Sequence, residues 1–97
     1  MADRHVEYHE GAVADVKSAV SWYQERSPKA AMNFIGELHR AVDTIRETPN
    51  RWPIGRNNTR RFLLLRFPFS VIYSSVIYSE VESIITILAV AHGSRRP

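Results

Sequence analysis

The stretch SPKAAMNFIGELHRAVDTIRETP, residues 27–49, decides the fold. It opens with a serine, which is a good helix N-cap, and with a proline, which suits the first helical position. It closes with Thr48-Pro49, and the residue before a proline resists the helical conformation. Between these ends, six apolar residues recur every three or four positions: Ala31, Phe34, Ile35, Leu38, Val42 and Ile45. The stretch therefore predicts an amphipathic helix from about Pro28 to Glu47.

A second helical pattern precedes this stretch, over residues 12–26. Four of its apolar residues share one helical face: Val13, Val16, Val20 and Tyr23. The link to the next helix is so short that we expect an antiparallel helical hairpin. Before it, the segment HVEYH at residues 5–9 alternates apolar and polar residues, which is typical of a short half-buried strand.

After the helices, the chain turns to β-structure. Residues 49–59, PNRWPIGRNNT, are rich in Pro, Gly and Asn and predict a loop. Three β-rich runs follow it: RRFLLLRF, FSVIYS and ESIITILAVA, the last over residues 82–91. We expect an α+β domain of order β-α-α-β-β-β. Its helical hairpin packs on a small, mainly antiparallel sheet, in which the last three strands form a meander and the N-terminal strand completes the sheet.

The middle run contains a tandem repeat, because residues 70–79, SVIYSSVIYS, are SVIYS written twice. Five is an odd number and strands have a period of two, so one continuous strand would turn the second copy to the opposite face. Either the hairpin lengthens, with a bulge that restores the parity, or the extra copy becomes a loop or an exposed edge that pairs with another chain. We expect the sheet to be retained, with the insertion at the hairpin tip around residues 74–80.

Composition and charge limit the class of protein. With 97 residues and 44% hydrophobic residues, the chain can form one core, so we expect a single domain over residues 1–97. It has no cysteine, which excludes disulfides and thiolate metal sites. We see no signal peptide and no run long enough to span a membrane, and we expect a cytoplasmic protein.

The charges divide between the two halves of the chain. Residues 1–50 hold six Lys/Arg and eight Asp/Glu, whereas residues 51–97 hold seven Arg and two Glu. Arginine offers a planar fork that pairs with carboxylates and phosphates. The second half therefore predicts a basic face that meets an acidic partner or nucleic acid.

Four segments together resemble the RelE/ParE toxin superfamily of bacterial type II toxin–antitoxin systems: WYQERSP at residues 22–28, TPNRWPIG at 48–55, RFPFSVIY at 66–73 and AVAHGSR at 89–95. They follow the order and spacing of the family over nearly the whole chain, if one SVIYS is removed. We therefore interpret the repeat as a five-residue tandem duplication. The resemblance implies a toxin that a cognate acidic, partly helical antitoxin neutralises by folding on its surface.

The resemblance also implies two activities. ParE-like members inhibit DNA gyrase and are not enzymes, whereas RelE-like members cleave mRNA on the ribosome. The long helical hairpin and the S-P junction favour the ParE side, and the scarcity of lysine weakens the nuclease interpretation. We expect a gyrase inhibitor. The alternatives are a ribosome-dependent endoribonuclease and an inactive member that acts only in a complex with the antitoxin.

Each activity has its candidate residues. A nuclease needs a base, an acid and cations near the phosphate, and the candidates for these roles are Arg60, Arg66, Tyr73 and His92. We expect the arginines of the second half to bind the antitoxin or the target: Arg51, Arg56, Arg60, Arg61, Arg66, Arg95 and Arg96. Exposed tryptophans would be natural anchors, but we expect Trp22 to pack in the core. We expect no cofactor and no metal site, and a strand edge could join two copies into a homodimer.

Overall fold

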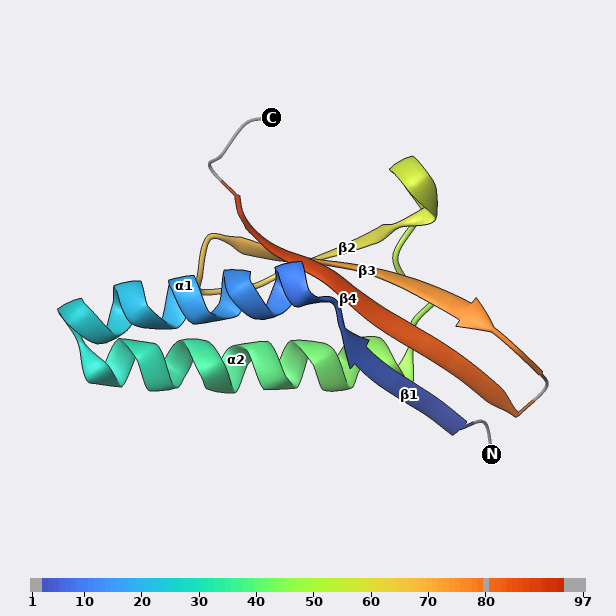
Figure 1. Cartoon of the computed structure of the whole chain (residues 1–97), viewed down its shortest axis with the longest axis horizontal. Helices are drawn as coiled ribbons and strands as arrows, with labels where there is room; N and C mark the ends of the chain where they lie inside the picture. Colours follow the sequence, from blue (N-terminus) through green and yellow to red (C-terminus); the bar gives the residue numbers. More distant parts are fainter. Residues whose placement is uncertain (1–2, 80, 94–97) are drawn as a thin grey trace.

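The computed structural model describes residues 3–79 and 81–93. Its elements are β1 (Asp3–Tyr8), α1 (Glu10–Arg26), α2 (Pro28–Glu47), the short 3-10 helix η1 (Arg56–Asn58), β2 (Arg60–Leu63), β3 (Phe69–Ile77) and β4 (Glu82–His92). The sheet has the strand order β1-β4-β3-β2, with β1 parallel to β4 and the other neighbours antiparallel. Figure 1 shows α1 and α2 lying side by side as a hairpin against this sheet. The predicted α+β fold, including the antiparallel meander, is confirmed.

The helix α2 begins and ends where the sequence predicts. The hydroxyl of Ser27 accepts a hydrogen bond from the backbone N–H of Ala30 at 3.2 Å, and Pro28 occupies the first turn. Phe34, Leu38 and Ile45 are buried in the core. No helix in the described part of the chain is long and apolar enough to cross a membrane.

The helix α1 packs Val16, Val20 and Tyr23 of the predicted stripe against the core, together with two alanines, but leaves Val13 outside it. It begins at Glu10, because the Nδ1 atom of His9 accepts a hydrogen bond from the N–H of Gly11 at 3.0 Å and so caps the helix. Ala12 and Ala19 are buried, whereas Val13 is exposed. The prediction for Val13 is wrong because the face that meets the sheet carries small residues, which allow the helix to lie close to β4.

The strand β2 is shorter than predicted, since only Arg60–Leu63 pair with β3. The N–H groups of Leu65 and Arg66, which a longer strand would use for pairing, are bound instead by a side chain of α2. Residues 64–68 therefore form a turn. The Leu65 side chain on this turn is 95% exposed.

The strand β3 contains the whole first copy of SVIYS and three of the five residues of the second. Val71 and Tyr73 of the first copy are fully buried, whereas their counterparts Val76 and Tyr78 are 50% and 65% exposed. The first copy thus fills the core strand, and the second copy lengthens the β3–β4 hairpin. The predicted tip at residues 74–80 is wrong at its start, because residues 74–77 remain in the strand and the turn begins at Tyr78.

A bulge in β4 keeps the core face of the sheet continuous. Ile72 lies opposite Ala89 and Tyr73 lies opposite Ile87, so Leu88 has no opposite residue on β3. This extra residue lets Ile87 and Val90 both face the core, although they are three positions apart. The bulge lies opposite the first copy of the repeat. The side chains of the second copy therefore still point to the opposite faces of the sheet from their counterparts in the first.

Aromatic rings pack the sheet against the end of the helical hairpin where α1 meets α2. Tyr23 of α1 and Phe34 of α2 have ring centroids 5.5 Å apart, and Phe67 lies 5.2 Å from Tyr23 and 5.4 Å from Phe34. Phe69, at the start of β3, lies 5.2 Å from Phe34. This cluster fixes the β2–β3 turn and the first residues of β3 against both helices.

Candidate partner-binding surface

A groove of about 860 Å³ runs between α1 and the C-terminal half of β4. Its apolar lining includes Trp22, Phe69 and Val90, and its polar lining includes Arg61 and His92. Within residues 3–79 and 81–93, no group of three or more His, Asp or Glu side chains could hold a metal ion. The aromatic side chains beside Arg61 offer apolar contacts and one positive charge, which fits a protein segment that carries both apolar and acidic residues.

The position of α1 along this groove is set by one carboxylate. The strand β1 ends at Tyr8, opposite Ile87, so it does not cover the rest of the β4 edge. There Asp15 of α1 accepts a hydrogen bond from the N–H of Val90, with an Oδ2 to N distance of 2.9 Å. Asp15 thus takes the place of a strand partner, and the helix becomes one wall of the groove.

Trp22 lies on this wall and is 51% exposed, so the prediction that it packs in the core is wrong. Adjacent residues of a helix point about 100° apart, and Tyr23 takes the core position of this turn. The guanidinium carbon of Arg26 lies 3.7 Å from the centroid of the Trp22 ring. An exposed tryptophan held by a cation is a good anchor for a binding partner.

The predicted arginines do not form one cluster. Arg61 lines the groove. Arg60, its neighbour on β2, points to the opposite face and donates to the backbone oxygens of Asn50 and Trp52. Arg51 lies with its guanidinium carbon 5.3 Å from the ring centroid of Trp52, and Arg56 lies on η1. Arg95 and Arg96 lie outside the described residues.

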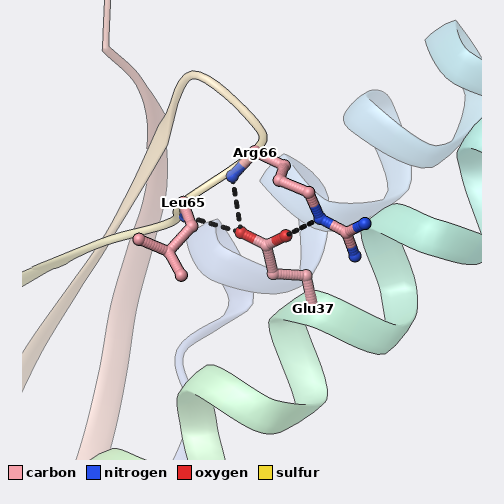
Figure 2. A network of polar contacts seen from close by, with 3 residues as sticks. All are labelled: Glu37, Leu65 and Arg66. Carbon is pink, nitrogen blue, oxygen red and sulfur yellow. Dashed lines mark hydrogen bonds and ion pairs between the residues drawn. The ribbon is translucent and has the colours of Figure 1, made fainter.

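Arg66 belongs to a network around a buried carboxylate (Figure 2). Glu37 Oε2 accepts hydrogen bonds from the N–H groups of Leu65 at 2.6 Å and Arg66 at 3.0 Å, and Glu37 Oε1 accepts one from Arg66 Nε at 3.2 Å. Burial raises the pKa of Glu37, but these hydrogen bonds and the charge of Arg66 together outweigh burial and hold the pKa below its ordinary value. The network clamps the β2–β3 turn to α2, and so presents Leu65 to solvent on a fixed support.

Tyr73 does not approach the surface that carries His92, so the two nuclease candidates do not share a surface. Its side chain is fully buried, and its hydroxyl donates to the backbone oxygen of Pro49 at 2.7 Å. Burial raises the pKa of Tyr73, and the nearby charge of Arg60 lowers it only in part. His92 instead lines the groove, where its ring packs edge-on against Phe69 at a centroid distance of 5.1 Å.

The four nuclease candidates are therefore divided among three places. Arg60 and Tyr73 are bonded to the loop after α2, Arg66 is bonded to Glu37, and His92 lies in the groove. General acid–base catalysis needs groups within hydrogen-bond reach of the same reacting atoms. In the described part of the chain, these four side chains therefore do not meet around one set of reacting atoms.

Two structurally important carboxylates, Asp15 and Glu37, are not among the residues expected from the sequence. Both are acidic residues on the apolar face of a helix: Asp15 lies between Ala12 and Ala19, and Glu37 lies between Phe34 and Ala41. A lone carboxylate in such a stripe signals a buried partner, because an unpaired charge there would be costly. The sequence does not tell which backbone groups each carboxylate binds.

The chain matches the protein family described as "ParE toxin of type II toxin-antitoxin system, parDE" over residues 6–97. It is also similar to a chain in a solved structure described as "Chromosomal ParDE TA system from P. aeruginosa". The TM-score is 0.72 at 20% sequence identity, and the match covers 92% of this chain and 95% of the other. At that identity, the structural likeness shows the fold alone. A search of curated protein sequences finds no match.

Proposed function

The chain belongs to the ParE toxin family of type II toxin–antitoxin systems, and from this we propose that it inhibits DNA gyrase by binding and is neutralised by an acidic antitoxin. The observation that supports binding over catalysis is the burial of Tyr73 and the separation of Arg60, Arg66 and His92. A binding inhibitor needs no assembled acid and base, only an exposed complementary surface. Gyrase as the target implies that the protein acts in the cytoplasm.

A direct experiment separates the binding inhibitor from the nuclease. Purified gyrase is given relaxed plasmid and titrated with this protein, and a cell-free translation reaction with a labelled mRNA is run in parallel. We expect loss of supercoiling and an intact mRNA. Cleavage of the mRNA, with supercoiling unaffected, would instead establish the ribosome as the target.

Single substitutions give a second test of the same distinction. Most residues of a binding surface cost little when they are truncated, because a few anchors carry most of the binding energy. We therefore expect Arg66→Ala and His92→Ala each to weaken gyrase inhibition by no more than about tenfold. Loss of all activity on one of these substitutions, in a protein that keeps its fold and its antitoxin affinity, would favour an enzyme.

We place the antitoxin in the groove between α1 and β4. Trp22 and Phe69 offer apolar contacts there, and Arg61 and Arg26 offer positive charge at its sides. A disordered acidic segment that folds on contact loses conformational entropy, so it needs well-defined anchors on the surface that it covers. An exposed indole beside a guanidinium provides such an anchor.

The groove is tested by comparing two exposed aromatic residues. Trp22→Ala should weaken antitoxin binding by about 30-fold or more, as expected for a hot spot. Tyr78→Ala is the matched control, because Tyr78 is also exposed but lies at the turn between β3 and β4. Isothermal titration calorimetry with the antitoxin encoded beside the toxin measures both affinities. Equal effects of the two substitutions would mean that the antitoxin does not bind in the groove.

A further inference from the structure

The last part of β3 has an open edge. The strand β2 pairs with β3 only as far as Tyr73, which lies opposite Arg60, whereas β3 continues to Ile77. On its other side, Ser74–Ile77 pair with β4. In the described part of the chain, no strand pairs with Ser74–Ile77 on the side away from β4. Figure 1 shows this end of the β3–β4 hairpin projecting beyond the C-terminal end of α2.

The backbone groups of Ser75 and Ile77 point to this open edge. The N–H of Leu64 donates to the oxygen of Phe69 at 3.0 Å, so Phe69 directs its backbone toward β2. The N–H of Tyr78 donates to the oxygen of Glu82 at 3.0 Å, so Tyr78 directs its backbone toward β4. The side to which the backbone N–H and C=O groups point alternates from one residue of a strand to the next. Ser75 and Ile77 therefore present these groups to a further strand.

The open segment lacks the features that usually protect an exposed strand edge. Natural edges carry charges, prolines or bulges, or are very short. The edge strand β2 has four residues, of which Arg60 and Arg61 are charged. By contrast, residues 74–79 contain no charge and no proline, and Val76 and Ile77 are exposed β-branched residues.

We propose that a second copy of this chain pairs with the open segment in an antiparallel manner, about a two-fold axis at Val76. In this register Ser75 of each copy lies opposite Ile77 of the other, and the two pairs exchange four backbone hydrogen bonds. The two Val76 side chains meet across the axis. Each copy uses the same open segment of β3 as its partner does, so this pairing closes as a dimer.

Charge favours a second copy over an acidic segment of another protein. The hairpin tip beyond Ile77 carries the exposed Glu82, and the start of β2, beside the open edge, carries Arg60 and Arg61. In the antiparallel register, the tip of each copy extends toward the start of β2 in the other, so opposite charges approach one another. An acidic segment would instead place its carboxylates against the uncharged residues 74–77.

A cysteine scan tests the register, and the chain has no cysteine of its own. Across the axis, the two Val76 residues form a non-hydrogen-bonded pair with Cα atoms about 4.5 Å apart, which suits a disulfide. The two Ile77 residues are offset by two positions, so their Cα atoms are about 8 Å apart, which is too far. Under mild oxidation, Val76→Cys should form a covalent dimer and Ile77→Cys should not. Equal cross-linking of both, or none with Val76→Cys, would overturn the proposal.

Sedimentation velocity tests the dimer without cysteines. Interfaces of this small size are weak, and we expect dissociation constants of about 10–100 μM, so the protein is measured on both sides of that range. Ile77→Lys should remain monomeric, while the control Met32→Lys, at an exposed apolar residue of α2, should dimerise like the unchanged protein. An unchanged protein that stays monomeric, grows beyond a dimer, or responds equally to both substitutions would contradict the proposal. Circular dichroism establishes that each variant is folded.

Discussion

Glu37 shows how one residue can set the length of a strand. Its carboxylate binds three N–H groups of the β2–β3 turn, so residues 64–66 leave the strand although their sequence is strongly β-forming. Glu37→Gln removes the charge that these donors stabilise. We expect a loss of about 1–3 kcal/mol in the free energy of unfolding, measured by urea denaturation. A loss below the error of the measurement would mean that the clamp is dispensable.

The same residue gives a dependence of stability on pH. The folded pKa of Glu37 lies below its ordinary value of 4.5. Its contribution is therefore fully present above that ordinary value and is lost as the pH falls through the folded pKa. Urea denaturation between pH 7 and pH 3 should show a decline for the unchanged protein that is smaller in Glu37→Gln. Parallel curves for the two proteins would contradict this assignment.

Tyr73 gives the clearest contrast between a structural and a catalytic role. Tyr73→Phe keeps the buried ring but leaves the Pro49 oxygen without the hydroxyl donor, at an expected cost of about 1 kcal/mol in the free energy of unfolding. Gyrase inhibition should be unchanged once the protein is folded. Loss of toxicity without loss of stability would return Tyr73 to the list of catalytic candidates.

At the level of elements, the sequence predicts those whose ends carry local signals. Both ends of α2 are marked by Ser27-Pro28 and Thr48-Pro49, and both are found where expected. The end of β2 depends on Glu37, which is 29 positions before Arg66, and no local signal marks it. The bulge at Leu88 likewise depends on how β3 and β4 align, which the sequence alone does not determine.

Only part of the lining of the groove could be predicted from the sequence. Arg61 and His92 were identified as candidates, and both line it. The spacing of the apolar residues in α1 predicts Tyr23 for the core, and the structure confirms it; the expectation that Trp22 also packs there is wrong. The rotation of α1 is fixed by the distant bond between Asp15 and Val90.

The repeat can be tested as an element by deleting residues 75–79. The first copy holds the fully buried Val71 and Tyr73, so the core strand stays intact in the deleted protein. We expect the melting temperature at low protein concentration to change little, because the removed side chains are largely exposed. A large drop in melting temperature would mean that the second copy supports the sheet and does not merely lengthen the hairpin.

At the scale of the whole molecule, the fold brings a basic C-terminal half onto a helical hairpin. One end of the sheet carries the groove beside α1, and the other end carries the projecting β3–β4 hairpin (Figure 1). A partner in the groove and a second copy at the hairpin would therefore occupy separate surfaces. This separation predicts that the deletion of residues 75–79 abolishes dimerisation while antitoxin affinity stays within about twofold, since distant sites act independently. Loss of antitoxin binding in the deleted protein would place both partners on one surface.

The most direct measurement is the supercoiling of relaxed plasmid by purified gyrase, titrated with the unchanged protein and with the protein that lacks residues 75–79. We expect both proteins to inhibit gyrase with similar potency, and the antitoxin to reverse both. If neither inhibits gyrase, the central proposal is contradicted. Inhibition by the deleted protein alone would show that the second SVIYS copy disables a gyrase toxin.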